Sequence, residues 1–276
     1  MKLIHKISLT LGTLGLVCLL AGCSQGQSQD KSIETIKAKK TLVLGTSADY
    51  APFEFPIIKN GQKEFAGYDI LVAKELAKSL GVSLKVDNIE FSSLISELQN
   101  KKCDVVLAGL TPTPQRKKVI SFSQNYCTYN FKNVLLVQKK DANRYNTAAS
   151  LANQSVGVQQ STTQEDIANK QLKASHIIPE SLVTGLATEL SHGKLAGIVV
   201  ENTIANDYLK LHPGKYAIAK VPLKTPAEGN TFAVGVRKQD RALLKKINQK
   251  LTEMKKSGKL EQLLKQALET QAKYSK

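Results

Sequence analysis

Short apolar runs alternate with amphipathic segments along most of this chain. The apolar runs predict buried strands at residues 41–44, 84–86, 105–108, 120–124, 133–137, 155–158, 195–200 and 231–236. Apolar residues that recur every three or four positions predict helices at residues 69–80, 92–100, 182–190 and 201–209, one opening near Thr162, and two on either side of Gly258. Strands and helices that alternate at this spacing build βαβ units, so we expect an α/β fold with largely parallel sheets.

The N-terminal segment has a different pattern. Lys2 and Lys6 precede an apolar run over residues 9–21, the layout of a secretion signal that is too short to span a bilayer. The run ends in Leu20-Ala21-Gly22-Cys23, which resembles the lipobox of bacterial lipoproteins. That resemblance implies removal of residues 1–22, lipidation of Cys23, and a stable anchor if two or more acyl chains are attached. The alternative is an ordinary signal peptide with an incidental cysteine.

The remaining chain of about 250 residues is long enough for one large domain or for two lobes of ordinary size. Residues 24–30 are rich in Ser, Gln and Gly and predict a flexible spacer. Because no second long apolar stretch follows, we expect a protein that is anchored to the membrane without spanning it.

The formal net charge is +16, and it falls to +14 when Lys2 and Lys6 are removed with the signal. Nucleic-acid binding is one interpretation of such an excess, but no zinc-ligand spacing or repeated aromatic–basic motif accompanies it. The basic residues are spread through predicted helices. They favour a solvated surface that faces an anionic membrane or cell wall, and we expect no nucleic acid among the partners.

Two cysteines remain after Cys18 and Cys23 are set aside. Cys103 precedes the strand at residues 105–108, and Cys127 follows the strand at residues 120–124. If these strands are parallel neighbours, the two thiols lie a strand length apart, of order 15–20 Å. A disulfide needs Cα atoms within roughly 7 Å, so we expect two free thiols.

Two strand-to-helix turns have the character of anion sites. In the first, Gly109 permits close approach to the backbone, Thr111 offers a hydroxyl group, and Thr113 with Pro114 starts a helix. Arg116 then falls in the first helical turn, where the helix dipole disfavours a cation, which indicates that an anion is bound there. The alternative is a surface arginine.

The second turn, at residues 159–166, places Ser and Thr at a helix start. Thr163 and the free backbone N–H groups could bind a carboxylate, or the turn is a plain helix cap. A third segment, residues 50–55, carries Tyr50, Phe53 and Phe55, with Phe91 further along. Aromatic side chains just after a strand can form a stacking platform for a ligand or part of the hydrophobic core, and from the sequence alone we favour the core.

Several motifs in a fixed order resemble the polar amino-acid-binding proteins of ABC importers, the bacterial solute-binding protein family 3. The likeness runs from about Thr41 to the C-terminus, and it rests on residues 45–55, 67–70, 91–95, 104–116, 121–126, 156–158 and 162–163. It implies two α/β lobes of the periplasmic-binding-protein type, with two mixed or parallel sheets flanked by helices and joined by two hinge strands. We expect residues 23–40 to form the lipidated spacer and first turn, 41–128 and 226–276 the first lobe, and 129–225 the second.

The resemblance implies one binding site for a free amino acid. Gly109, Thr111 and Arg116 match positions that hold the α-carboxylate, with Thr163 contributing from the second lobe. Glu201 matches a position, most often Asp, that binds the α-ammonium group. A zwitterion held by an arginine on one lobe and a carboxylate on the other would bridge the lobes, so binding would drive closure.

The remaining site positions concern the ligand side chain. Tyr50 and Phe91 match rings that enclose it, whereas Ser47 and Gln159 are uncharged where relatives can carry Asp and Lys. These two residues favour a neutral polar ligand such as glutamine, or cystine. Asp49 and Glu54 retain arginine as a further candidate ligand.

A binding protein without a cofactor or metal is therefore expected, although cyclohexadienyl dehydratases resemble the same fold and an adhesin with a basic face is a second alternative. The chain shows no nucleophile elbow, no Walker loop and no His/Cys metal spacing. We expect a monomer that works with the membrane subunits of an ABC importer, lipid-anchored on the outer face of a Gram-positive-type cell membrane.

Overall fold

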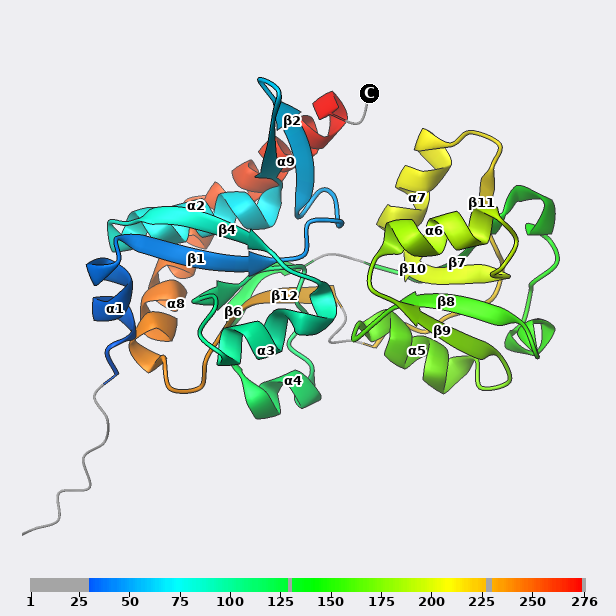
Figure 1. The fold of residues 1–276 in the computed structure, drawn as a ribbon, viewed down its shortest axis with the longest axis horizontal. Helices are drawn as coiled ribbons and strands as arrows, with labels where there is room; N and C mark the ends of the chain where they lie inside the picture. Colours follow the sequence, from blue (N-terminus) through cyan, green and yellow to red (C-terminus); the bar gives the residue numbers. More distant parts are fainter. Residues whose placement is uncertain (1–29, 129–130, 227–229, 275–276) are drawn as a thin grey trace, which may run out of the picture.

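The structure is a computed structural model that describes residues 30–128, 131–226 and 230–274 (Figure 1). The predicted signal peptide and the predicted lipidation site at Cys23 lie outside these residues. The described chain forms two lobes, each built on a five-stranded mixed sheet with helices on its faces. The expected two-lobed α/β fold is confirmed. In the described part of the chain, no helix is long and apolar enough to cross a membrane.

The sheet of the first lobe has the order β4-β1-β5-β12-β6. Its strands are β1 (Thr41–Thr46), β4 (Ser83–Asn88), β5 (Val105–Val106), β6 (Ser121–Thr128) and β12 (Thr231–Val236). Strand β1 pairs in parallel with β4 and β5, whereas β12 pairs antiparallel with β5 and β6. Because β12 comes from the far end of the sequence, the first lobe is completed only after the chain has built the second.

Helices cover both faces of this sheet. They are α1 (Ser32–Ala38), α2 (Tyr68–Leu80), α3 (Leu94–Gln99), α4 (Pro114–Val119), α8 (Arg241–Lys256) and α9 (Lys259–Tyr274), with the 3-10 turn η1 (Phe91–Ser93) before α3. The predicted apolar face of α2 is buried, including Ile70, Leu76 and Leu80, and Gly81 ends the helix in the left-handed conformation. A hairpin of β2 (Phe55–Lys59) and β3 (Gln62–Ala66) stands beside α9 (Figure 1).

The sheet of the second lobe has the order β11-β7-β10-β8-β9. Its strands are β7 (Asn133–Gln138), β8 (Ser155–Gln159), β9 (His176–Glu180), β10 (Gly197–Glu201) and β11 (Tyr216–Ile218). Its helices are α5 (Thr163–Gln171), α6 (Val183–Ser191) and α7 (Asn202–Leu211), and the short turns η2 (Lys139–Asp141) and η3 (Ala148–Leu151) follow β7. One hydrophobic cluster joins α5 to the sheet, and a separate one joins α6 and α7 to it.

The expectation of largely parallel sheets is correct for only part of each sheet. Strand β7 runs antiparallel to β10 and β11, and β12 runs antiparallel to β5 and β6; each is the first strand after the chain changes lobe. The first change of lobe falls between β6 and β7 and the second between β11 and β12, and each of these connections includes residues outside the described ranges. The lobe boundaries and the hinge strands therefore remain predictions.

Cys103 and Cys127 are buried and unpaired, as expected, but the geometric argument for this was wrong. Strand β12 separates β5 from β6, and Cys127 lies inside β6 rather than after a strand. The two thiols belong to different hydrophobic clusters, Cys127 with α2 and α8 and Cys103 with α3. Their separation therefore follows from packing in different parts of the core.

Gly67 occupies a backbone conformation that only glycine adopts easily, with φ 124° and ψ 175°. A Cβ atom there would lie 2.2 Å from the carbonyl oxygen of Phe53. We therefore expect Gly67→Ala to lower the free energy of unfolding by about 1–3 kcal/mol, measured by urea denaturation. Gly81→Ala is the control. No atom lies near the added Cβ atom, so the only cost is the left-handed backbone conformation, roughly 1 kcal/mol. Equal losses for both variants would contradict the steric argument.

Candidate functional site

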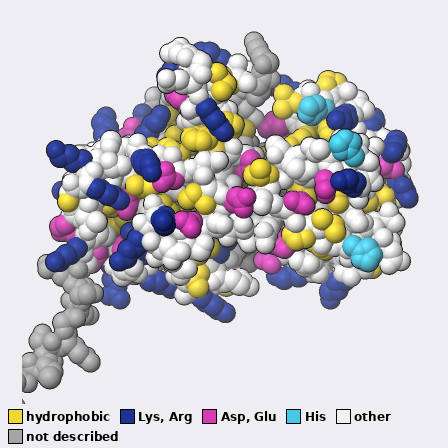
Figure 2. All heavy atoms as spheres, viewed as in Figure 1, with side chains coloured by type: hydrophobic (Ala, Val, Ile, Leu, Met, Phe, Trp, Pro, Cys, Tyr) yellow, Lys and Arg dark blue, Asp and Glu magenta, His cyan; other side chains and the backbone are white. Residues whose placement is uncertain are grey.

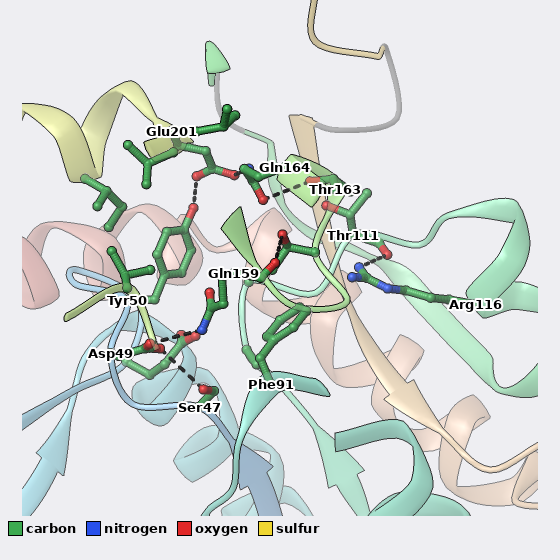
Figure 3. Close-up of a pocket in the computed structure, with 18 residues that line it drawn as sticks. Ser47, Asp49, Tyr50, Phe91, Thr111, Arg116, Gln159, Thr163, Gln164 and Glu201 are labelled. Atoms are coloured by element: carbon green, nitrogen blue, oxygen red, sulfur yellow. Dashed lines mark hydrogen bonds between the residues drawn. The ribbon is translucent and has the colours of Figure 1, made fainter. Parts of the chain in front are cut away.

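A cavity lies between the two lobes and brings together all nine site positions expected from the sequence (Figure 3). The first lobe contributes Ser47, Tyr50, Phe91, Gly109, Thr111 and Arg116, and the second contributes Gln159, Thr163 and Glu201. The cavity is also lined by Asp49, Glu54, Ala108, Thr162, Gln164, Val183, Val199, Val200 and Ile204. The sheet order places these groups together because β1, β5, β8 and β10 all end at the cleft.

The guanidinium group of Arg116 is buried at one end of the cavity. Thr113 caps α4 and accepts a 3.3 Å hydrogen bond from the Arg116 backbone N–H, which fixes where this side chain leaves the helix. The Nη1 atom of Arg116 donates to the Thr111 carbonyl oxygen at 2.9 Å, and its Nη2 atom donates across the cleft to the Ser161 carbonyl oxygen at 2.9 Å. The guanidinium carbon also lies 5.3 Å from the centre of the Phe91 ring.

Burial lowers the pKa of Arg116 to about 10, which still leaves the group charged at neutral pH. Among the described residues no carboxylate forms an ion pair with it. A buried cation is costly when the opposite charge that acts on it, here that of Asp166, lies beyond ion-pair distance. Arg116 is therefore suited to receive the carboxylate of a ligand.

Glu201 occupies the end of β10 and is 9 % exposed. Its carboxyl group accepts hydrogen bonds from the Tyr50 hydroxyl group of the other lobe and, at 3.1 Å, from Gln164 Nε2. Burial raises the pKa of Glu201 to about 8. An ammonium group beside it would favour the ionised form, which makes this carboxyl a suitable partner for a ligand amine.

Asp49 lies on the other side of Tyr50 from Glu201, in the loop after β1 (Figure 3). Gln159 Nε2 donates to it across the cleft at 3.0 Å, and Ser47 Oγ donates at 3.3 Å. Burial raises the pKa of Asp49, although these hydrogen bonds oppose the shift. Ser47 and Gln159 therefore both bind Asp49 in this conformation.

The fourth charged group of the cavity is Glu54, which is only 1 % exposed. Burial raises its pKa well above the usual range, and the nearby carboxyl groups of Asp69 and Asp49 raise it further. From the sequence, Glu54 was interpreted only as a reason to retain arginine among the candidate ligands. A carboxylate inside an aromatic segment was the available indication that it lines a site.

The interpretation of the aromatic segment as core is correct for Phe53 and Phe55, which are buried. It is wrong for Tyr50 and Phe91, which line the cavity. The sequence also gave no indication of Gln164, whose Nε2 links Glu201 to Asn133 at 3.1 and 2.9 Å. Within the described ranges, no cluster of His, Cys, Asp or Glu is arranged to hold a metal ion.

Comparison with protein families gives a match over residues 42–270 to the model described as bacterial extracellular solute-binding proteins, family 3. The arginine-binding extracellular protein ArtP of Bacillus subtilis (strain 168) is 33 % identical over 254 residues, which are 89 % of this chain and 91 % of that protein.

The solved structures that resemble this chain include further amino-acid-binding proteins. An amino-acid ABC transporter substrate-binding protein, AbpA, of Streptococcus pneumoniae Canada MDR_19A bound to L-arginine has a TM-score of 0.78 and 30 % identity, covering 86 % of this chain and 98 % of that one. The ancestral amino-acid-binding protein AncCDT-1, a precursor of cyclohexadienyl dehydratase, has a TM-score of 0.73 and 32 % identity, covering 89 % and 100 %.

Proposed function

Since this chain belongs to the bacterial extracellular solute-binding proteins, family 3, we propose that it captures free L-arginine between its lobes and delivers it to an ABC importer. The choice of arginine as the ligand rests on the charged side chains that line the cavity. Its lining holds three carboxyl groups, those of Asp49, Glu54 and Glu201, and one guanidinium group, that of Arg116.

An α-amino acid uses two of these four groups. Arg116 pairs with the α-carboxylate and Glu201 with the α-ammonium group, which leaves Asp49 and Glu54 for the side chain. A guanidinium group offers five N–H donors in a planar fork that matches carboxyl oxygens. A neutral side chain would leave buried carboxyl groups without a cation, which is unfavourable.

The two residues that favoured a neutral ligand have another role in this structure. Ser47 and Gln159 both donate to Asp49, so their polar groups hold a carboxylate in place. This arrangement supports a cationic ligand over glutamine or cystine. It also supports a longer side chain, because Asp49 lies on the opposite side of the cavity from Arg116 (Figure 3).

A thermal-shift screen of the twenty amino acids and cystine tests the choice of ligand. A ligand present at about 100 times its dissociation constant stabilises the folded protein by roughly 2.7 kcal/mol. We expect L-arginine to give the largest shift, with a smaller shift for lysine and none for D-arginine. A larger shift with glutamine or cystine would overturn the assignment to arginine.

We further propose that the ligand is bound and released unchanged. His176, His192 and His212 do not line the cavity, whose polar groups are those expected for binding a zwitterion. Turnover of prephenate or arogenate by the purified protein would support the dehydratase alternative instead. On the face shown in Figure 2 the basic side chains are dispersed among acidic ones, so no concentrated patch on that face favours a polyanion.

Lipid anchoring at Cys23 is part of the proposed function, because a captured solute is useful only close to the importer. The support is the Leu20-Ala21-Gly22-Cys23 motif after a charged and apolar leader. We expect Cys23→Ser to release the protein from membranes or to leave it unprocessed, while Cys18→Ser leaves anchoring intact. Mass spectrometry that finds unmodified Cys23 in membrane-derived protein would contradict this proposal.

A further inference from the structure

Two buried carboxyl groups meet beneath the cavity. Glu54 follows the loop that carries Tyr50, and Asp69 lies in the first turn of α2. They are 1 % and 0 % exposed, and their side chains are within hydrogen-bonding reach of each other. Only Glu54 lines the cavity, so the pair connects the ligand space to the core of the first lobe.

Asp69 also positions part of the binding site. Its Oδ2 accepts hydrogen bonds from the Gly109 backbone N–H at 2.8 Å and from the Tyr126 hydroxyl group at 2.7 Å. A Cβ atom on Gly109 would lie 2.6 Å from the Tyr50 ring, so the loop and the ring are closely packed. The ionised form of Asp69 is the better acceptor for both hydrogen bonds.

The hydrogen bonds open to Glu54 and Asp69 require a proton on one of the two carboxyl groups. Apart from the contact between the two carboxyl groups, neither oxygen of Glu54 has a hydrogen-bond partner among the described residues, and Asp69 Oδ1 has none. Ionised carboxylates only accept hydrogen bonds, and two of them in contact repel each other. One proton between Glu54 and Asp69 provides the missing donor and removes the repulsion.

In the part of the chain that the structure describes, no cation acts on the pair in place of this proton. The titratable groups that act on it are Asp49 from the loop after β1, Tyr68 from α2, and Tyr126 and Cys127 from β6. Across the cavity lie Glu201 and Arg116, and the Arg116 guanidinium group is directed to Thr111 and Ser161. The space beside Glu54 therefore favours a cation brought by the ligand.

We propose that Glu54 and Asp69 share one proton in the unliganded protein and that the cationic side chain of the ligand displaces this proton to solvent. The pair then selects for a charged side chain, since a neutral one leaves the proton in place. This inference rests on the proposed binding of arginine and adds a proton-linked specificity determinant to it.

The proton is retained near neutral pH because burial, with the nearby carboxyl groups of Asp69 and Asp49, raises the pKa of Glu54 well above its usual range. Below the pKa of the pair, the affinity for arginine should fall by up to about tenfold per pH unit. Glu201 contributes a separate proton exchange that every α-amino acid shares. A neutral ligand of the same shape is therefore needed as a reference.

Calorimetric titration of the full chain with L-arginine and with L-citrulline, in two buffers of different ionisation enthalpy, counts the protons released. We expect arginine to release about one proton more than citrulline. Arginine that binds without releasing more protons than citrulline would overturn this inference and leave the proposed function intact. A failure of arginine to bind would overturn both.

Glu54→Gln should abolish the extra proton and weaken arginine binding, with little effect on citrulline. Glu64→Gln in β3 is the matched control, because Glu64 is exposed and outside the cavity, and it should leave the proton count unchanged. If Glu54→Gln does not fold, infrared difference spectra of the unaltered protein decide the question. Addition of arginine should remove more of the protonated-carboxyl band than addition of citrulline, because citrulline binding deprotonates only Glu201; equal losses with the two ligands would overturn the inference.

Discussion

Arg116→Ala should weaken the binding of L-arginine by about 2–5 kcal/mol, the range typical of removing one partner from a desolvated charge pair. In the variant, the α-carboxylate of the ligand would enter the cavity without a cation, because Arg116 is the only Lys or Arg among the described lining residues. Arg116→Lys should recover only part of the loss, since an ammonium group cannot form the bidentate contact of a guanidinium group.

The measurement is calorimetric titration of each variant with arginine. Lys118→Ala is the matched control, because Lys118 is exposed on the same helix, α4, and lies outside the cavity. We expect the Arg116 variants to fold, since the guanidinium group contacts carbonyl oxygens at the cleft and no carboxylate of the core. Unchanged affinity in folded Arg116→Ala would show that the carboxylate binds elsewhere.

The local sequence indicated that Arg116 would lie near the cleft, because its position depends on adjacent residues. Thr113 and Pro114 start α4, and the apolar run before Gly109 forms a buried strand, so the arginine must project near the end of that strand. Glu201 was predictable for the same reason, since it ends the fully buried strand β10. Gly109, Thr111 and Thr163 were likewise indicated by their two strand-to-helix turns, whereas the site roles of Ser47, Tyr50, Phe91 and Gln159 came only from the resemblance to a family.

Contacts between distant segments could not be predicted in this way. Gln159 and Asp49 come from different lobes, and nothing near either residue indicates that an amide will hold a carboxylate across the cleft. The contact between Glu54 and Asp69 likewise depends on how the loop before β2 packs on the start of α2. The direction of β12 was missed because an apolar run predicts burial and carries no information about strand direction.

Glu201→Gln should weaken binding of every α-amino acid ligand by about 1.5–3 kcal/mol, because the ammonium group loses a charged hydrogen-bond partner while the shape of the site is kept. This outcome differs from that of Glu54→Gln, which should discriminate between arginine and citrulline. Parallel titrations of both variants with both ligands separate recognition of the ammonium group from recognition of the side chain.

The pH dependence of Glu201→Gln provides a second test. Burial raises the pKa of Glu201 from its ordinary value of 4.5 to about 8, so the unliganded folded protein binds a proton that the unfolded chain releases. The stability associated with this group is therefore present below about pH 4.5 and is lost as the pH rises toward 8.

The pH dependence of ligand affinity has the opposite sign, since the ammonium group of the ligand needs the ionised carboxylate of Glu201. Affinity for citrulline should rise between pH 6 and pH 8 by up to about tenfold per unit. In Glu201→Gln the citrulline affinity should lose this rise with pH, and the stability measured by urea denaturation should lose the part that Glu201 contributes while keeping the part from Glu54 and Asp69. A citrulline affinity that keeps its full rise with pH in this variant would show that another group accepts the ligand amine.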